Sequence, residues 1–413
     1  MNAIVFGNGR SGKAAAELLR RDGAFVRVLD GEDAWPKGEW DVCVASPGVP
    51  CDHPWQIAAR VAGVRVVSEL QLGAERFRSM GGRMLAVTGS KGKSSVVKLV
   101  ADALEGIPCG NYGLPLCEVV LNCRLAGGRL PFAVVEVSSF QMETTHLPPD
   151  AFVAAAILNL QEDHLDRHGS VEAYHALKRK LLDFTPAGII VGENGGAKEK
   201  AQIERDVCLM SGSYFDNPVL RENGLCAVAL MRAAGLGDEA IRSAFSRFVA
   251  LPHRMQVVCE ENGVAWIDDS KATSISALVA GVEMAVSRQL HVSLALGRCF
   301  RGAGGATGKV RLIAGGKPKG DDPLSAKECL ARGVAKVYLI GQSAQEFASA
   351  WSDVVACEVC GTLEAAVDSA RCDASEGDCV LLSPGTASFD QFASYSERGD
   401  RFADLACGRR KMV

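Results

Sequence analysis

Short apolar runs alternate along this chain with segments whose apolar residues recur at helical spacing. Each run predicts a buried strand. The expected strands are Ile4–Phe6, Phe25–Leu29, Asp41–Ala45, Met84–Val87, Phe132–Val135, Ala151–Leu160, Val264–Ile267, Val310–Ala314, Val337–Ile340 and Cys379–Leu382. Strands that alternate with helices indicate doubly wound units with parallel sheets, so we expect the α/β fold class.

Changes in this pattern predict three domains, at residues 1–80, 81–250 and 251–413. The proline-marked segment Leu251–Arg254 begins the last of them. A length of 413 residues is in keeping with about three domains.

Composition narrows the class of protein. A net charge of -4 argues against a nucleic-acid binder, and the chain has no apolar run long enough for a membrane span. The N-terminal residues enter a strand without the basic region of a secretory signal, so we expect a cytoplasmic protein. Fifteen cysteines, with metal-knuckle spacing only at Cys357 and Cys360, favour free thiols over disulfides or zinc.

The stretch Met84–Val100 has the layout of a phosphate-binding loop between a strand and a helix. Gly89 and Gly92 allow successive backbone N–H groups to point inward. Lys93 could reach the outer phosphates, and the Ser94 hydroxyl could bind magnesium. Because Val87 stands where the Walker pattern has its first glycine, the alternative is a glycine turn beside a surface lysine.

A second glycine-rich loop indicates a different kind of nucleotide site. Gly7–Gly12 matches G-x-G-x-x-G, and Asp30 follows the next strand, as in dinucleotide-binding proteins. An NAD-dependent dehydrogenase is therefore an alternative. A mononucleotide could occupy the same place, because the underlying physics is anion binding at a helix N-terminus.

Candidate metal ligands follow two strands of the central region. Glu136 ends a buried strand, where ligands of open α/β sheets gather, and His164 lies in a polar cluster after another strand. Ser170 can cap the next helix, on which Lys178 lies at the edge of an apolar stripe while Lys180 points away. A helix-capping role for Glu136 and a Lys178 that reaches to solvent are the alternatives.

In this order the motifs resemble those of the Mur ligases, across the whole chain. The segments that carry the resemblance are Thr88–Ser94, Glu136–Gln141, Asn159–Arg167, Leu251–Arg254 and Asp268–Thr273. Three C-terminal segments are similar to the D-glutamate-adding members in particular: Leu382–Pro384, Ala387–Phe392 and Glu397–Gly399.

The resemblance implies a Rossmann-like N-terminal domain, a P-loop ATPase-like central domain and a Rossmann-like C-terminal domain. These would bind a UDP-sugar substrate, ATP and an amino acid. ATP would phosphorylate the terminal carboxylate of UDP-N-acetylmuramoyl-L-alanine, and the D-glutamate amine would attack the acyl phosphate. Closure of the last domain would exclude water, and the protein would work as a monomer in peptidoglycan precursor synthesis.

The resemblance also implies roles for individual residues. The catalytic group would be Lys93, His164 and Lys178, and two magnesium ions would be held by Ser94, Glu136, His164 and a carbamate on Lys178. ATP would contact Gly89, Ser90, Lys91, Gly92, Lys93, Ser94, Ser95, Asn223, Arg254 and Asp269. The UDP substrate would contact Gly9, Arg10, Ser11, Asp30, Ser46, Gly48 and Asn111. D-glutamate would be surrounded by Lys271, Thr273, Lys319, Ser388, Phe389 and Tyr395.

The D-glutamate site also carries a geometric expectation. If Ser388–Tyr395 is helical, Ser388 and Tyr395 lie two turns apart and face one pocket, with the Ser388–Phe389 backbone at the helix start.

This sequence departs from the family pattern at several positions. Lys91 replaces the usual Asn, and Val219–Leu220 replaces a common His-Asn pair. Gly315–Lys319 lacks the usual Asp, so Lys317 could compete with Lys319, and the segment 289–309 is long and glycine-rich. A sister Mur or folate-type polyglutamate ligase and a nonenzymatic ATP-regulated binding protein remain alternatives.

Overall fold

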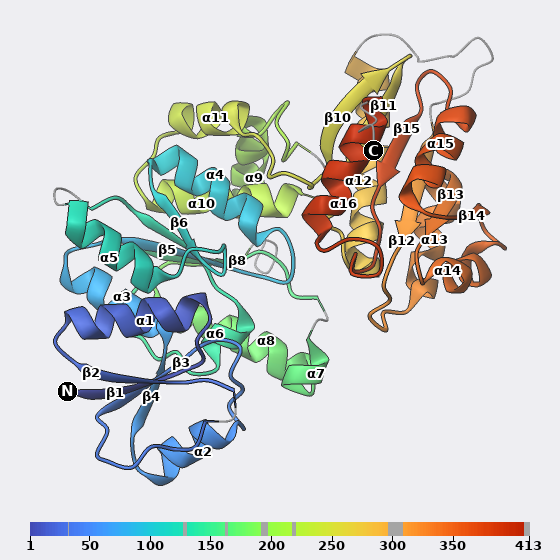
Figure 1. Ribbon diagram of the computed structural model, residues 1–413. Coiled ribbons are helices and arrows are strands. Elements are labelled where there is room, and N and C mark those ends of the chain that lie inside the picture. Colours follow the sequence, from blue (N-terminus) through green and yellow to red (C-terminus); the bar gives the residue numbers. More distant parts are fainter. Residues whose placement is uncertain are drawn as a thin grey trace. The chain divides into compact units, whose positions relative to one another are not determined.

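The computed structural model describes residues 1–31, 33–126, 130–161, 164–190, 197–216, 220–295 and 309–408 (Figure 1). The chain divides into two compact units, the first ending at Phe248 and the second beginning at Val249. In both units, strands alternate with helices along the chain and assemble into mainly parallel sheets, which confirms the α/β class. In the described ranges, no helix has the length and apolar character needed to cross a membrane.

The first sheet has the strand order β2-β1-β3-β4, and all of its strands are parallel. Its elements are β1 (Asn2–Phe6), α1 (Arg10–Arg21), β2 (Phe25–Leu29), β3 (Val42–Ala45), α2 (Pro54–Val61), β4 (Arg65–Ser68) and α3 (Glu69–Ser79). Because the chain crosses to opposite sides of β1, the ends of β1 and β3 form the switch point at which such sheets bind ligands.

The second sheet has the order β6-β7-β5-β8-β9, again parallel throughout. Its strands are β5 (Met84–Thr88), β6 (Ile107–Gly110), β7 (Ala133–Glu136), β8 (Ala154–Ile157) and β9 (Gly188–Ile190). Its helices are α4 (Lys93–Leu104), α5 (Leu116–Ala126), α6 (Ser139–Met142), α7 (Leu165–His168), α8 (Val171–Arg179), η1 (Lys180–Phe184), α9 (Ala197–Leu209), α10 (Arg221–Ala233) and α11 (Asp238–Arg247).

Strand β8 is shorter than the expected Ala151–Leu160. Its four residues pair with β5, and after Leu158 the chain leaves the sheet to meet the glycine loop that follows β5. The apolar run was therefore correct in place but too long, because Ala151, Phe152 and Leu158 are buried although they lie outside the strand.

The first two sheets share one hydrophobic core. Val5 of the first sheet and Val135 of the second belong to the same buried cluster, and α3 packs against α5. At Gly73 of α3, a Cβ atom would lie only 2.9 Å from the Cys117 backbone nitrogen, so the two helices approach closely. The predicted boundary at residue 80 thus falls within one continuous packing unit, and the three domain ranges stay predictions.

The second unit contains one sheet of order β10-β11-β15-β12-β13-β14, parallel except for β10. Its strands are β10 (Gln256–Glu261), β11 (Val264–Asp268), β12 (Val310–Gly315), β13 (Val334–Ile340), β14 (Ala356–Gly361) and β15 (Cys379–Leu382). Its helices are α12 (Ile275–Ala295), η2 (Pro323–Ala326), α13 (Lys327–Gly333), α14 (Ala344–Trp351), α15 (Leu363–Asp373) and α16 (Tyr395–Ala406). Each face of the sheet has its own core, one with α12, α13 and α14 and one with α15 and α16.

Several expectations fall at the margins of the described chain. Residues 289–295 of the glycine-rich segment continue α12, while 296–308, with the glycines at 302, 304, 305 and 308, lie outside the described residues. Asp163 and Val219 also lie outside them. All cysteines in the described ranges are free thiols, as predicted.

Candidate active site

The loop between β5 and α4 has the backbone of an anion cradle. Gly89 and Gly92 adopt left-handed φ angles of 148° and 81°. At Gly92 a Cβ atom would lie 2.1 Å from Asn223 Nδ2, so this position accepts glycine alone without rearrangement. Gly92 is the N-cap of α4 and brings no side chain to it, which leaves the helix start to be capped by a ligand.

Two asparagines fix this loop from outside. The Lys91 N–H donates to Asn159 Oδ1 at 2.8 Å, and Asn159 Nδ2 donates back to the Lys91 carbonyl at 3.0 Å. Asn159 Nδ2 also lies 3.3 Å from Asn223 Oδ1, so the structure brings the predicted Asn223 onto the loop. Asn159 had no predicted role of its own, although its place directly after a buried strand indicates the ligand-binding edge of the sheet.

Ser90 links the same loop to the segment that follows β8. Its hydroxyl donates to the Gln161 carbonyl at 2.9 Å and accepts from the Gln161 N–H at 2.9 Å. The Tyr174 hydroxyl lies 3.2 Å from the same oxygen. The cradle is therefore held by the Tyr174 side chain of α8 and by the backbone of Gln161 in the segment after β8.

Two lysine ammonium groups converge on one carbonyl of the loop. Lys93 Nζ donates to the Gly89 oxygen at 2.8 Å and to the Ser90 oxygen at 3.0 Å. Lys178 Nζ donates to the same Gly89 oxygen at 2.9 Å and lies 4.6 Å from the Tyr174 ring centroid. Lys178 is only 2% exposed, so the prediction that it points inward is confirmed. The Lys93 ammonium at this loop fits a site for a multiply charged anion.

Glu136 lies beside the loop, at the end of β7, with one oxygen left to bind. Its Oε1 accepts from Asn111 Nδ2 at 2.8 Å, whereas its Oε2 is buried without a hydrogen-bond partner. An orphaned carboxylate oxygen beside a phosphate cradle fits a magnesium ligand. Within the described chain, no group of three or more His, Cys, Asp or Glu side chains is placed to hold a metal ion.

His164 precedes the short helix α7 in a left-handed conformation, with φ of 53°. Its ring centroid lies 4.9 Å from that of Phe140 and 6.3 Å from that of Tyr174, the residue that reaches Ser90. The predicted metal histidine is thus close to the elements that hold the cradle.

The Gly7–Gly12 loop also needs its glycines. A Cβ atom at Gly12 would lie 1.9 Å from the Gly7 carbonyl oxygen, and Ser46 Oγ would be 3.0 Å from that Cβ. Ser46 Oγ is buried without a hydrogen-bond partner, which fits a polar ligand at this switch point. Arg10 forms an ion pair with Glu118 of α5 at 3.1 Å. Asp30 is exposed, and its Oδ1 accepts from the Gly31 N–H.

In the second unit, a buried arginine joins the loops predicted to surround D-glutamate. Arg398 is 0% exposed. Its guanidinium donates to the Ser270 hydroxyl and carbonyl at 2.9 and 3.0 Å. It also donates to the Thr386 and Ala387 carbonyls at 3.2 and 3.3 Å. The Asp268–Thr273 segment and the segment before Ser388 are therefore fixed to each other.

Of the side chains predicted to bind D-glutamate, some lie close together beside the segments held by Arg398 and others are exposed. Lys271 Nζ lies 3.8 Å from the Tyr395 ring centroid. Burial raises the pKa of the Tyr395 hydroxyl, but the Lys271 ammonium opposes this effect and the pKa lies below its ordinary value. Lys317 pairs through its backbone with Ala387, and both Lys317 and Lys319 are exposed, so the geometry favours neither as the ligand lysine.

The expected helix from Ser388 to Tyr395 is wrong. Ser388 and Phe389 lie in a turn, and α16 begins only at Tyr395, with Ser394 as its N-cap. Ser388 accepts both the Gln391 and Phe392 N–H groups through its carbonyl, which closes a tight turn before the helix. Ser388 is buried whereas Phe389 is 68% exposed, so the argument from two helical turns does not hold.

Two predicted ATP contacts, Arg254 and Asp269, belong to the second unit. Asp269 Oδ2 accepts from the Ser383 hydroxyl at 3.0 Å, and Oδ1 accepts from the Met255 N–H at 3.3 Å. Burial raises the pKa of the Asp269 carboxyl to about 7. In the neighbouring His253, Nδ1 lies 2.7 Å from Asp268 Oδ2, and the hydrogen bond to this carboxylate raises the pKa of the imidazole.

Comparison with known proteins gives these arrangements a context. Residues 87–206 match the Mur ligase middle domain, and residues 253–385 match the Mur ligase glutamate ligase domain. The UDP-N-acetylmuramoylalanine--D-glutamate ligase of Acidobacterium capsulatum is 33% identical, over 98% of this chain and 96% of the relative. The enzyme of the same name from Sphingopyxis alaskensis is 34% identical, over 96% of this chain and 95% of the relative.

Solved structures agree at the level of fold. UDP-N-acetylmuramate-alanine ligase MurC from Thermotoga maritima has a TM-score of 0.55 at 15% identity, over 99% of this chain and 100% of that one. MurF ligase from Thermotoga maritima in complex with ADP has a TM-score of 0.56 at 15% identity, over 98% and 94%. Together with the full-length sequence matches, they show that this chain belongs to the Mur ligase family, among relatives named UDP-N-acetylmuramoylalanine--D-glutamate ligase.

Proposed function

We propose that this chain is an ATP-dependent ligase that joins D-glutamate to UDP-N-acetylmuramoyl-L-alanine in peptidoglycan precursor synthesis. The observation that carries the proposal is the convergence of Lys93 and Lys178 on the Gly89 carbonyl, inside a glycine cradle at the start of α4. The full-length relatives of that name supply the substrate.

The reaction requires the chain to bring two anions together. The γ-phosphate of ATP and the substrate carboxylate are both anions, so their approach must be screened before an oxygen of the carboxylate can attack phosphorus. Lys93 and the N-terminus of α4 provide fixed positive charge for this step. ADP leaves, the D-glutamate amine attacks the acyl carbon, and phosphate departs with the former carboxylate oxygen.

Two magnesium ions fit the residues of the first unit. Ser94 and Glu136 would hold one, and His164 with Lys178 the other, so that bound magnesium neutralises charge on the phosphates. For this role the buried Lys178 amine would react with carbon dioxide, releasing a proton and leaving an anionic carbamate. Burial supports this chemistry because it favours the neutral, nucleophilic amine.

The remaining predicted residues would position the substrates. The ends of β1 and β3, with Ser46 and Gly9, would receive the uridine-diphosphate group. The frame held by Arg398 would present Lys271, Thr273, Ser388 and Tyr395 to D-glutamate, whose two carboxylates need cations and hydroxyl donors. We propose that the protein acts as a cytoplasmic monomer on these small molecules, without nucleic acid or membrane.

A reconstitution assay tests the proposal. Phosphate release should require ATP, magnesium, UDP-N-acetylmuramoyl-L-alanine and D-glutamate together, and L-glutamate should be a poor substrate because inversion at the α-carbon misplaces the amine. A preference for another amino acid would instead favour a sister Mur or folate-type ligase. Turnover of a nicotinamide cofactor would favour the dehydrogenase suggested by Gly7–Gly12.

A second assay addresses Lys178. Lys178→Ala should lose nearly all activity and recover part of it when acetate or another short carboxylate is added. Full activity without additive would reduce Lys178 to a structural residue.

A further inference from the structure

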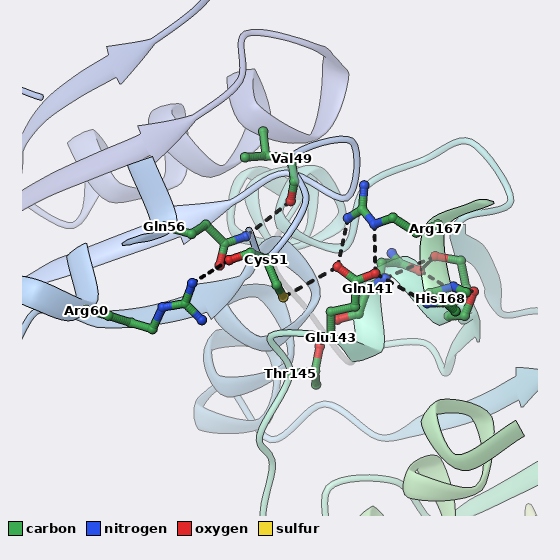
Figure 2. A network of polar contacts seen from close by, with 11 residues as sticks. Val49, Cys51, Gln56, Arg60, Gln141, Glu143, Thr145, Arg167 and His168 are labelled. Carbon is green, nitrogen blue, oxygen red and sulfur yellow. Dashed lines mark hydrogen bonds and ion pairs between the residues drawn. The ribbon is translucent and has the colours of Figure 1, made fainter. Parts of the chain in front are cut away.

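A network of polar contacts joins the loop after β3 to the α6–α7 region (Figure 2). Its centre is Glu143, which directly follows α6 and has a side chain only 10% exposed. Arg167 Nε donates to Glu143 Oε1 at 2.9 Å, and Arg167 Nη2 donates to Oε2 at 2.7 Å. This bidentate, largely buried pair is the strongest form of contact between such groups.

The pair fixes the turn that carries His164. Arg167 belongs to α7, a helix of only four residues. Because so short a helix has little stability of its own, its anchor decides its position. The Arg167 and His168 N–H groups both donate to the His164 carbonyl at 3.1 Å, so a shift of Arg167 moves the His164 backbone directly.

Aromatic and imidazole groups form further contacts between α6 and the turn that carries His164. The Phe140 ring centroid lies 5.0 Å from the Arg167 guanidinium carbon and 4.9 Å from the His164 ring. His168 Nδ1 lies 3.6 Å from Glu143 Oε1, and its Nε2 lies 3.0 Å from Ser139 Oγ. Both ends of α7 are thus held by contacts with α6 and with the Glu143 carboxylate that follows it.

On its other side, Glu143 touches the first sheet. The Cys51 thiol donates to Glu143 Oε2 at 3.5 Å. The loop that bears Cys51 is itself held by α2, since Gln56 Nε2 donates to the Val49 carbonyl at 3.1 Å and Arg60 Nη2 to the Cys51 carbonyl at 2.6 Å. The thiol contact is weaker than the ion pair and serves the first-sheet loop rather than α7.

We propose that Glu143 is a positioning residue that holds the His164 turn in place through its bidentate pair with Arg167. The inference rests on the proposed function, because it takes His164 as a ligand of the second metal ion. His164 in a left-handed conformation costs free energy, so the surrounding contacts must impose it.

The test is metal binding, measured by electron paramagnetic resonance titration of Mn²⁺ into the full chain with a non-hydrolysable ATP analogue. Glu143→Gln keeps the size of the side chain but loses the charge. One Mn²⁺ site should be lost altogether in His164→Ala. Glu143→Gln should raise the Mn²⁺ concentration needed to fill this site about tenfold, the usual effect of losing a residue that supports a metal ligand. Affinity for the analogue without metal should stay within about twofold, because the cradle contacts do not involve Glu143.

Two matched variants make the result specific. Asp206→Asn makes the same chemical change in a carboxylate 11% exposed that pairs with Arg232 at 2.6 Å, far along the chain from the candidate site. Cys51→Ala removes only the thiol contact. Neither should change Mn²⁺ affinity. An equal loss in Asp206→Asn would show a general stability effect, and an equal loss in Cys51→Ala would show that the ion pair is not the route; either result overturns the proposal.

Failure of the proposed function would look different. Wild-type protein that binds Mn²⁺ at a His164-dependent site but releases no phosphate with D-glutamate would contradict the function and leave the positioning role standing. Unchanged Mn²⁺ affinity in Glu143→Gln, in protein whose wild type is an active ligase, would contradict the positioning role alone.

Discussion

The first unit contains two glycine loops with the same local design. Gly7–Gly12 and Gly89–Gly92 each follow a strand flanked on both sides by parallel neighbours, and each leads into a helix of 12 residues. Neither helix has a side-chain cap at its N-cap glycine, Gly9 or Gly92. Judged by backbone alone, both are anion sites.

Their surroundings differ. The Gly89 loop is held by two asparagines and approached by two lysines, whereas Gly9 and Arg10 of the other loop are exposed and Arg10 is paired with Glu118. A fixed cation such as Lys93 suits a group that gains charge during reaction, and an open loop with one buried hydroxyl suits a group that is only held. The shared motif therefore indicates anion binding, and the neighbouring side chains separate catalysis from recognition.

The largest expected effect comes from removing the cation of the catalytic loop. Lys93→Ala should lower kcat by at least about 10²-fold, because a preorganised charge at the transferring phosphoryl group is lost. Lys98→Ala is the matched control on the same helix, since Lys98 forms an ion pair with Asp102 of α4. Phosphate-release kinetics and circular dichroism of both variants would decide, and near-normal turnover in Lys93→Ala would remove the distinction between the loops.

The two N-cap glycines give the next contrast. Gly92→Ala forces a side chain into a left-handed backbone and against Asn223, whereas a Cβ atom at Gly9 has no heavy atom within 4 Å. Gly92→Ala should weaken binding of an ATP analogue at least tenfold, about 1.4 kcal/mol, and Gly9→Ala should leave it unchanged. Calorimetric titration measures both, and equal affinities would mean that the loop tolerates displacement.

Within the first loop, Gly12 and Gly9 should behave differently. Gly12→Ala places a Cβ atom 1.9 Å from the Gly7 carbonyl oxygen, and such overpacking should cost about 1–3 kcal/mol of stability. Affinity for the UDP substrate should fall with it, while Gly9→Ala keeps the stability of the wild type. Denaturant unfolding and UDP-substrate titration would show this, and an undisturbed Gly12→Ala variant would contradict the close strand–helix approach.

The last prediction concerns the core that the two sheets share, and its effect appears only in the pH dependence of stability. Glu69, at the start of α3, accepts from the Cys117 N–H, while its second oxygen is buried without a partner. Burial raises its pKa from 4.5 to about 6, so the folded state holds the proton more tightly than the unfolded state. Its stabilisation is complete below pH 4.5 and is lost as pH rises through about 6.

Glu69→Gln should therefore flatten the pH dependence of unfolding between about pH 4.5 and 6 by up to about 2 kcal/mol. Denaturant midpoints measured across that range provide the comparison with wild type. An identical slope in both proteins would show that Glu69 titrates alike in the folded and unfolded states.

Prediction from sequence succeeded where local pattern determines structure. The strand before Gly89, the helix after it, the capping of α8 by Ser170 and the inward position of Lys178 all follow from spacing and residue type. It did not succeed where distant contacts decide. Asn159 acquires its role only because β8 lies beside β5, which sequence spacing does not encode.

The turn at Ser388 shows the same limit. Helical spacing suggested that Ser388 and Tyr395 share a face, but the buried Arg398 holds the Thr386 and Ala387 carbonyls, and the chain reaches α16 only after a turn. Glu143 is the corresponding case in the first unit, since its partners come from two distant segments, the loop that bears Cys51 and helix α7.

Transfer of an oxygen isotope from substrate to phosphate tests most directly whether one loop holds the substrate and the other catalyses its phosphorylation. UDP-N-acetylmuramoyl-L-alanine labelled with ¹⁸O in its terminal carboxylate would be incubated with the protein, ATP, magnesium and D-glutamate, and the released phosphate analysed by mass spectrometry. If the substrate held by the first loop is phosphorylated at the second, each phosphate should carry one ¹⁸O atom. Phosphate without the label would mean that ATP is hydrolysed by water, and would contradict the account.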